Sequence, residues 1–422
     1  MNKHKKATKS VYTTLHQVVQ LIPRWMIPKI ANDVGVDTRG FSETSHIVSL
    51  LFGQLAHTFS LNEICDACAV HEKRLLRIRN VSLPKRNTLS NANRTRNPEI
   101  ANRLYWDMVS HLSTRSPKFT DRGKHRGFLH RVKRKIYAID STVLQLTLSC
   151  IDWAKHRRRK AAIKAHVKLE VGSFIPSLII LERASHHDST KAVELCTGIS
   201  SGDIVVADKA YIDFAFLYGL DMSDVFFVLR AKENMSYHVI ERAIPSSEDV
   251  IEDSSIELDG QQASAKYPKT LRLIRMNVEV DSEMREMTFI TNKFDWAART
   301  IAELYKARWD IELFFKELKQ TLQLSDFIGT NENAVRWQIW IAMLAHLLLH
   351  YIKYKSRWKQ SFSRMVGIVR SAVWMKDDII KFLIRYGTAG PPRRPMPVFK
   401  QLYLQGFEPN TSKLMGQHIY KK

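Results

Sequence analysis

The sequence predicts an α/β protein in which helices flank a mixed sheet, with an all-helical region before the sheet and a β-rich insertion within it. Two short apolar runs, 136–139 and 204–207, each end in an aspartate, and such uninterrupted runs are typical of strands covered on both faces. Residues 305–319 have the apolar spacing of a helix. Several alternating runs between 226 and 292 indicate further strands.

The first part of the chain predicts a separate helical domain. Segments 61–65 and 87–94 have the composition of two helices that could form a helix-turn-helix motif. In that interpretation Arg94 and Arg96 approach DNA. The alternative is ordinary packing between short amphipathic helices.

The two apolar runs place acids at strand ends. Asp140 closes the first run and Asp208 closes the second. An acid in this position lies at the rim of the sheet, where α/β folds tend to build sites. Between the two runs, 166–171 and 175–181 predict a hairpin. Either aspartate taken alone could equally be a turn former or a helix cap.

The segment 305–319 is the most informative part of the chain. At about 100° per residue, four polar side chains fall within roughly 60° of one another on an α-helix: Tyr305, Arg308, Glu312 and Lys319. The opposite side is apolar, with Ile311, Phe314, Phe315, Leu318 and Leu322. The polar stripe offers one carboxylate for a divalent metal and three groups suited to a phosphate backbone. The alternative is a solvated surface helix with local ion pairs.

The spacing Tyr-x2-Arg-x3-Glu-x6-Lys resembles the signature of the IS4 family of bacterial insertion-sequence transposases. This resemblance implies an RNase H-like catalytic core with an Asp-Asp-Glu triad and a β-rich insertion. It makes Asp140, Asp208 and Glu312 the expected catalytic and metal-binding residues. Three acids can hold two Mg²⁺ ions, with Mn²⁺ as a substitute, and two such ions serve in-line phosphoryl transfer.

The resemblance also implies a function and partners. A transposase of this family cleaves DNA at the ends of its insertion sequence and joins them to target DNA. The expected partners are double-stranded DNA, both terminal inverted repeats and target, and a second copy of the chain in a homodimer. Arg308 and Lys319 would hold phosphates, and Tyr305 would contact the DNA backbone. Two alternatives remain: a catalytically silent DNA-binding relative, and a nuclease of the same fold without strand transfer.

The insertion differs from that of relatives in one respect. Relatives carry a tryptophan there that is associated with a flipped DNA base, whereas no tryptophan occurs here between Trp153 and Trp296. Either base flipping is managed differently, or another side chain substitutes, the candidates being Tyr237, Tyr267, Met276 and Trp296.

Other possible metal ligands are weaker signals. Cys65 and Cys68 have zinc-ligand spacing, but no second pair completes a site, so reduced thiols are expected. His186, His187 and Asp188 resemble a His-Asp element of the family. A loop role is favoured there over an independent metal site.

The chain is strongly basic. Lys plus Arg number 65 against 42 Asp plus Glu, a net charge of +23, which indicates a polyanionic partner. Two basic runs, 122–135 and 155–168, flank Asp140, and the second contains the candidate DNA contacts Arg157, Arg158 and Arg159. Charge alone would also permit binding to ribosomes or membrane surfaces.

These patterns predict five segments. They are a helical DNA-binding domain, the first part of the core, the insertion, the second part of the core with Glu312, and C-terminal helices with a linker and tail: 1–125, 126–225, 226–292, 293–355 and 356–422. The apolar stretch 337–352 is short for a membrane span and predicts a buried helix. We expect a bacterial cytoplasmic protein associated with the nucleoid and not with a membrane.

Overall fold

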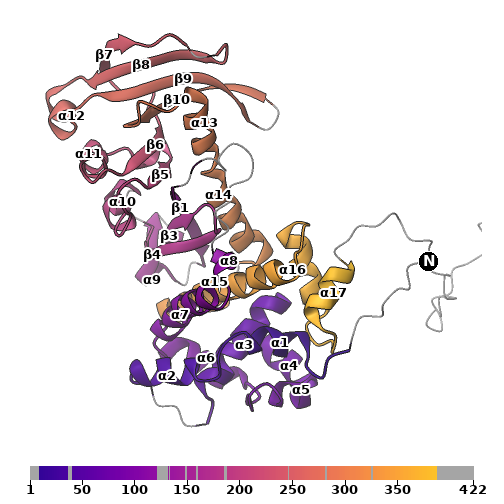
Figure 1. The fold of residues 1–422 in the computed structure, drawn as a ribbon. Helices are drawn as coiled ribbons and strands as arrows, with labels where there is room; N and C mark the ends of the chain where they lie inside the picture. The colour runs from indigo at the N-terminus through magenta and orange to yellow at the C-terminus, as the bar shows by residue number, and fades with distance from the viewer. Residues whose placement is uncertain are drawn as a thin grey trace, which may run out of the picture.

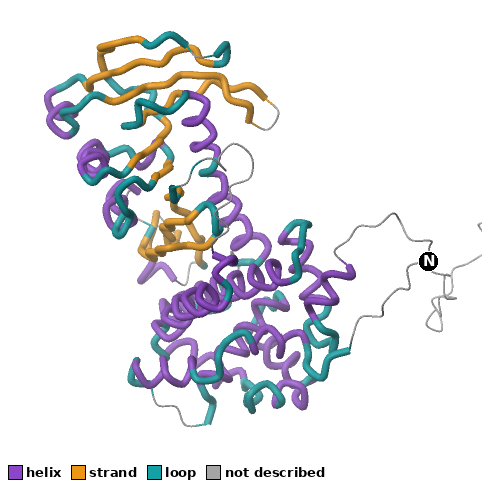
Figure 2. Tube along the Cα trace, in the orientation of Figure 1, coloured by secondary structure: helices purple, strands orange, loops and turns teal. Residues whose placement is uncertain are grey.

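The computed structural model describes residues 9–36, 40–120, 132, 134–147, 150–157, 160–184, 188–245, 247–280, 283–324 and 327–386. They form a helical body, indigo and yellow in Figure 1, and a sheet that carries the insertion at its far end. Figure 2 shows the same division between helices and strands. Most of the basic run 122–135 lies outside the described residues, as does the end of the C-terminal segment.

The described helices that precede the sheet are α1 (Thr14–Gln20), α2 (Met26–Asp33), α3 (Glu43–Ala56), α4 (Leu61–Val70), α5 (Glu72–Leu76), α6 (Arg86–Thr95), α7 (Glu99–Arg115) and α8 (Pro117–Thr120). Those that come after its last strand are α13 (Ala298–Lys306), α14 (Trp309–Lys316), α15 (Glu332–Lys355), α16 (Phe362–Ser371) and α17 (Ile379–Tyr386). Sequence sets several helix starts, because Ser42, Ser60 and Asn331 each accept a hydrogen bond from the backbone N–H three residues later.

The strands of the sheet are β1 (Ile136–Leu146), β2 (Lys155–Arg157), β3 (Lys160–Glu170), β4 (Ile175–Arg183), β5 (Ile204–Ala207), β6 (Phe226–Arg230), β7 (Tyr237–Arg242), β8 (Val250–Leu258), β9 (Leu271–Val280) and β10 (Glu283–Thr291). β3 runs antiparallel to β1 and β4, whereas β1, β5 and β6 are parallel. The order β4-β3-β1-β5-β6 is that of an RNase H-like sheet. The predicted mixed sheet flanked by helices, with its hairpin between the two aspartates, is therefore confirmed.

The insertion extends the same sheet. β10 pairs with the end of β6, and β9, β8 and β7 come next in order. The predicted insertion 226–292 thus begins with a core strand, since β6 pairs in parallel with β5. A buried arginine fixes the insertion to residues 293–296. Arg272 Nη2 lies 2.6 Å from Asp253 Oδ2. The same guanidinium donates to the carbonyl oxygens of Lys293, Phe294 and Trp296.

Side chains of the core strands alternate between two apolar clusters. Ala138 and Val206 belong to the cluster that includes α13 (Ala298–Lys306), α14 (Trp309–Lys316) and α15. Their neighbours Ile139, Val205 and Ala207 belong to the cluster on the other face, with α10 (Ala192–Leu195) and α11 (Phe214–Met222). Burial on both faces explains why these strands read as uninterrupted apolar runs.

α15 lies at the centre of the helical body. Nearly all of its residues from Ala334 to Ile352 are buried, and it contacts α3, α6 and α7. A helix that is apolar on all sides needs such surroundings, so the predicted buried helix is confirmed. In the described part of the chain, no helix has the length and apolarity to cross a membrane.

The helical body uses both ends of the described chain. Gln17 on α1 donates to the carbonyl of Asp377 at 2.7 Å and accepts from the N–H of Ile379 at 3.0 Å. The helices predicted around 61–65 and 87–94 form as α4 and α6. The short helix α5 and a loop lie between them, so their connection is longer than the three to four residues of a helix-turn-helix motif.

Candidate active site

The two aspartates lie side by side, but only Asp208 follows the end of its strand. Asp140 was predicted to close a strand, whereas β1 continues past it to Leu146 through its pairing with β3. Ile139 of β1 is the register partner of Ala207 of β5 in a parallel pair, which places Asp140 beside Asp208. Since side chains alternate along a strand, Asp140 shares the face of Ala138, and Asp208 that of Val206. This is the face covered by α13 and α14.

Glu312 lies on α14, which contacts β1 on that face. The segment 305–319 does not form the single straight α-helix that the sequence predicted. α13 ends at Lys306, a turn follows at 307–308, and α14 starts at Trp309. After α14 the chain forms a π-helical turn, η5 (Glu317–Thr321). The expected stripe is therefore interrupted twice, although all five residues of its apolar side are buried.

The break between the helices places Arg308 among the carboxylates. Its Nη2 lies 2.8 Å from Glu312 Oε1, and its Nη1 lies 3.7 Å from Asp140 Oδ2. The Arg308 side chain is only 9% exposed. One guanidinium thus links the acid of β1 to the acid of α14.

Tyr305 links the third acid to the same group. Its hydroxyl donates to Asp208 Oδ1 at 3.4 Å, and the Arg308 guanidinium lies 5.2 Å from the centre of its ring. The ring also lies 5.1 Å from that of Phe289 on β10. Tyr305 is buried, so the side chain that was predicted to contact the DNA backbone lies inside the protein against Asp208.

Lys319 lies apart from this group. It belongs to the π-helical turn and lines a small space with Thr142 and Leu144, farther along β1 than Asp140. Burial lowers the pKa of its ammonium group. Of the four signature residues, Tyr305, Arg308 and Glu312 therefore lie together. The fourth, Lys319, lies beside the outer half of β1.

The acids carry more negative charge than the one guanidinium balances. Burial raises the pKa of Asp140 to about 6. The Ser141 N–H and Arg308 oppose this shift, while the like charges of Asp208 and Glu312 add to it. Three hard oxygen donors with uncompensated charge suit divalent ions such as Mg²⁺, so the residues present fit the implied metal.

This charge predicts a pH dependence of stability. The folded pKa of Asp140, about 6, exceeds the ordinary value of 3.8, so the folded state binds the proton more tightly. The bound proton stabilises the folded state fully below about pH 4. This contribution to the free energy of unfolding, roughly 2–3 kcal/mol, is lost as the pH rises through about 6. We expect Asp140→Asn to remove this loss in metal-free buffer. Denaturant unfolding at several pH values measures the effect.

The matched control is Asp33→Asn, because Asp33 lies exposed at the end of α2. That variant should keep the wild-type pH profile. If Asp140→Asn also keeps the wild-type profile, the raised pKa of the Asp140 carboxyl does not cause the loss of stability between about pH 4 and about pH 6.

The remaining DNA-contact candidates differ in their surroundings. Arg94 is exposed on α6, and its Nη2 donates to Asn91 Oδ1. The guanidinium of Arg96 instead donates to the carbonyls of Phe41 and Ser42, which ties it to the helical body. Arg157 ends β2, whereas Arg158 and Arg159 lie outside the described residues.

The structure describes all four side chains that could replace the missing tryptophan, and one of the three residues of the His-Asp element. Tyr267 and Met276 are buried, whereas Tyr237 and Trp296 are partly exposed. Asp188 begins a short helical turn. His186 and His187 lie outside the described residues.

Two aspartates on neighbouring strands of an RNase H-like sheet, on the face covered by a helix that carries a glutamate, define a class of divalent-metal enzymes that act on nucleic acids. Comparison with known families agrees. The chain matches the model of the transposase DDE domain over residues 131–348, about half its length. It also matches a domain of unknown function, DUF4372, over residues 10–78. The chain belongs to the DDE transposase family, and is thus a DNA transposase that binds DNA and depends on divalent metal.

Individual relatives are consistent with this assignment. A protein described as a transposase in Sinorhizobium fredii is 32% identical over 246 residues, 57% of this chain and 67% of the relative. The transposase named for insertion sequence element IS5377 of Geobacillus stearothermophilus is 27% identical over 225 residues, 53% of this chain and 58% of that protein. The transposase named for insertion sequence element IS4SA of Synechocystis is 24% identical over 266 residues, which are 62% of this chain and 70% of that protein. The predicted resemblance to insertion-sequence transposases is confirmed.

Among solved structures, the chain is similar to a piggyBac transposase synaptic complex with hairpin DNA. The TM-score is 0.40 and the sequence identity is 10%, with 93% of this chain and 84% of the other covered.

Proposed function

We propose that Asp140, Asp208 and Glu312 are the catalytic residues of this transposase and that they bind two Mg²⁺ ions. The observation that carries this proposal is the meeting of the three acids around Arg308 and Tyr305. When bound, the ions would activate water or a DNA 3′-hydroxyl and stabilise the leaving oxygen. The nucleophile is then not a side chain of the protein.

The protein's own groups hold this arrangement in place. Arg308 balances part of the acidic charge before DNA arrives, and Tyr305 orients Asp208 through its hydroxyl. Arg308 and Lys319 are cations within or beside the site, so we assign them to phosphates near the cleaved end. Their separation along β1 would let them contact different phosphates.

We infer a wider DNA interface from the charge. The net charge of +23 suits long duplexes that carry terminal inverted repeats and target DNA. We further propose a homodimer that bridges two element ends, and action at the nucleoid in the bacterial cytoplasm. The N-terminal helices, with exposed Arg94, would recognise the repeats.

The test is cleavage of a duplex that carries the DNA flanking the protein's own gene. Purified protein is incubated with Mg²⁺, with Mn²⁺ or with a chelator, and a second duplex is supplied as target. Metal-dependent breaks at defined ends, followed by joining to the second duplex, are expected. Breaks without joining would indicate a nuclease, and binding without breaks would indicate a silent DNA-binding relative.

The basic run after Asp140 makes a separate prediction. Neutralising Arg157, Arg158 and Arg159 to Gln should weaken binding to all DNA sequences alike. It should lower the slope of log affinity against log salt by about 2–3, since each phosphate contact contributes about 0.9. Binding titrations at several salt concentrations measure the slope.

A triple variant with the same loss of charge serves as control. It neutralises exposed side chains scattered over the insertion, namely Arg242, Lys266 and Arg285. This control should change the slope less. Equal slopes for wild type and the first variant would exclude that run from the interface.

A further inference from the structure

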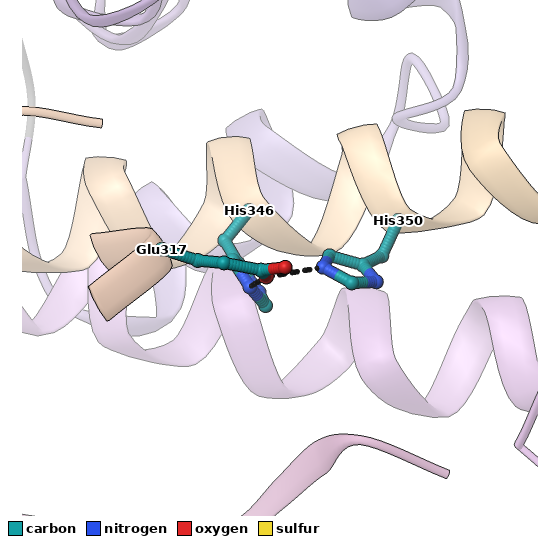
Figure 3. A group of neighbouring side chains, drawn as sticks. All are labelled: Glu317, His346 and His350. Carbon is teal, nitrogen blue, oxygen red and sulfur yellow. Dashed lines mark hydrogen bonds and ion pairs between the residues drawn. The ribbon is translucent and has the colours of Figure 1, made fainter. Parts of the chain in front are cut away.

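A buried cluster of one carboxylate and two imidazoles lies where the end of the Glu312 helix meets α15 (Figure 3). Glu317 opens the π-helical turn, and His346 and His350 lie one turn apart on α15. Glu317 Oε2 is 2.8 Å from Nε2 of each histidine. Within the described residues, this is the only group of three such side chains whose ligand atoms all lie within 4.8 Å.

We propose that Glu317, His346 and His350 form a binding site for one zinc ion, separate from the three-carboxylate site. Histidines at positions i and i+4 of a helix present both Nε2 atoms to the same side. Two imidazoles and one carboxylate favour zinc over Mg²⁺, which prefers oxygen ligands. Three protein ligands leave the fourth position of a tetrahedral ion to water.

Charge argues for a cation at this place. Glu317 is 6% exposed, and burial of a carboxylate is costly unless a positive charge compensates it. The ion pairs found for Glu317 among the described residues are those with the two histidines. Each of these pairs carries opposite charges only when its histidine is protonated. A zinc ion would supply the charge and bind all three groups at once.

The ligand spacing is close to that of a zinc site. Bonds of about 2.0–2.1 Å at tetrahedral angles put ligand atoms about 3.3 Å apart. The carboxylate would therefore withdraw by about half an ångström from each imidazole. The two histidine rings already lie side by side, with centroids 4.2 Å apart, so neither has to change helix face.

Aromatic side chains hold the imidazoles in position. Phe362 stacks on His350 with ring centroids 4.5 Å apart, and Phe314 meets His346 edge-on at 5.0 Å. Phe174 lies 5.3 Å from His350. A shell of aromatic rings restricts the orientation of the two imidazole ligands.

The position of the cluster indicates what the ion would connect. Glu317 follows Glu312 by five residues along one continuous helical segment, whereas both histidines belong to the central helix of the helical body. A zinc ion here would fix the end of the Glu312 helix to α15. It would thereby hold the helix that carries one proposed catalytic acid at a set distance from the helical body.

The first experiment uses the full chain without a polyhistidine tag. The protein is loaded with zinc, passed through gel filtration in Mg²⁺ buffer and analysed for metal. About one tightly held zinc per chain is expected, and Co²⁺ in its place should give the visible absorption of a tetrahedral nitrogen–oxygen site. No retained zinc, with a thermal unfolding temperature unaffected by zinc or a chelator, would overturn the proposal and leave a hydrogen-bonded network.

Variants locate the ion. Glu317→Gln and His350→Gln should each lower zinc affinity at least about 100-fold, because Gln keeps hydrogen-bonding capacity but is a poor ligand. Glu312→Gln should retain zinc, which separates this site from the proposed catalytic one. His46→Gln, which alters a buried histidine bonded to Asn93, should also retain it. Wild-type affinity in both ligand variants would overturn the proposal, and none of these readouts requires DNA cleavage.

Discussion

Replacing Glu312 by Gln should lower the rate of DNA cleavage by at least about 10³-fold while leaving binding to the same DNA within about twofold. A lost metal ligand removes several kcal/mol of transition-state stabilisation, and each 1.4 kcal/mol corresponds to about tenfold in rate. Binding should persist because Glu312 is itself negative and makes no favourable contact with phosphates. Single-turnover cleavage and gel-shift titration measure the two quantities separately.

Glu303→Gln is the matched control. Glu303 lies on α13, nine residues before Glu312, and pairs with Lys306 at the surface of that helix. This variant should cleave DNA at nearly the wild-type rate. Strong cleavage by Glu312→Gln would show that the helical acid is not part of the catalytic centre.

Arg272→Met should lower the free energy of unfolding by about 3–5 kcal/mol. The substitution leaves Asp253 buried, with its side chain only 9% exposed, and without a counter-charge. It also removes the donor for three carbonyls in the segment that leads into α13. Denaturant unfolding followed by tryptophan fluorescence measures the loss.

Two further variants test the cause. Arg285→Met removes a pair with Glu283 in which the side chains are 55% and 69% exposed, so it should cost less than about 0.5 kcal/mol. Combining Arg272→Met with Asp253→Leu should recover part of the loss, since the buried charge is then absent. A double variant as unstable as the sum of its parts would show that packing, not charge, explains the effect.

The acids of the site were predictable because each depends on local sequence. A segment buried on both faces of a sheet appears as a short apolar run, so the aspartate that follows each run can be recognised from the sequence alone. The end of the strand could not be recognised in the same way at Asp140, because β1 continues to Leu146. The parallel register of Ile139 with Ala207 then brings Asp140 and Asp208 together. Glu312 was identified by the resemblance of the spacing Tyr-x2-Arg-x3-Glu-x6-Lys to the signature of the IS4 family.

The shape of the Glu312 helix could not be predicted in the same way. A periodicity of 3.6 residues describes a straight helix, whereas this segment turns at 307–308 and forms a π-helical turn after Lys316. Both departures depend on what packs around the segment, including the sheet and α15. The role proposed for Glu317 could not be predicted from sequence spacing either, because its partners are 29 and 33 residues away.

The contact between α1 and residues 377–379 in the helical body has a consequence for biosynthesis. Because α1 bonds directly to residues 377–379 and α15 fills the centre of the body, the N-terminal helices cannot complete their core on the ribosome until residue 379 has emerged. Long-range closure of this kind is slow and leaves apolar surface exposed in the meantime. Chains that terminate before residue 379 would therefore expose apolar surface of the helical body and be prone to aggregation.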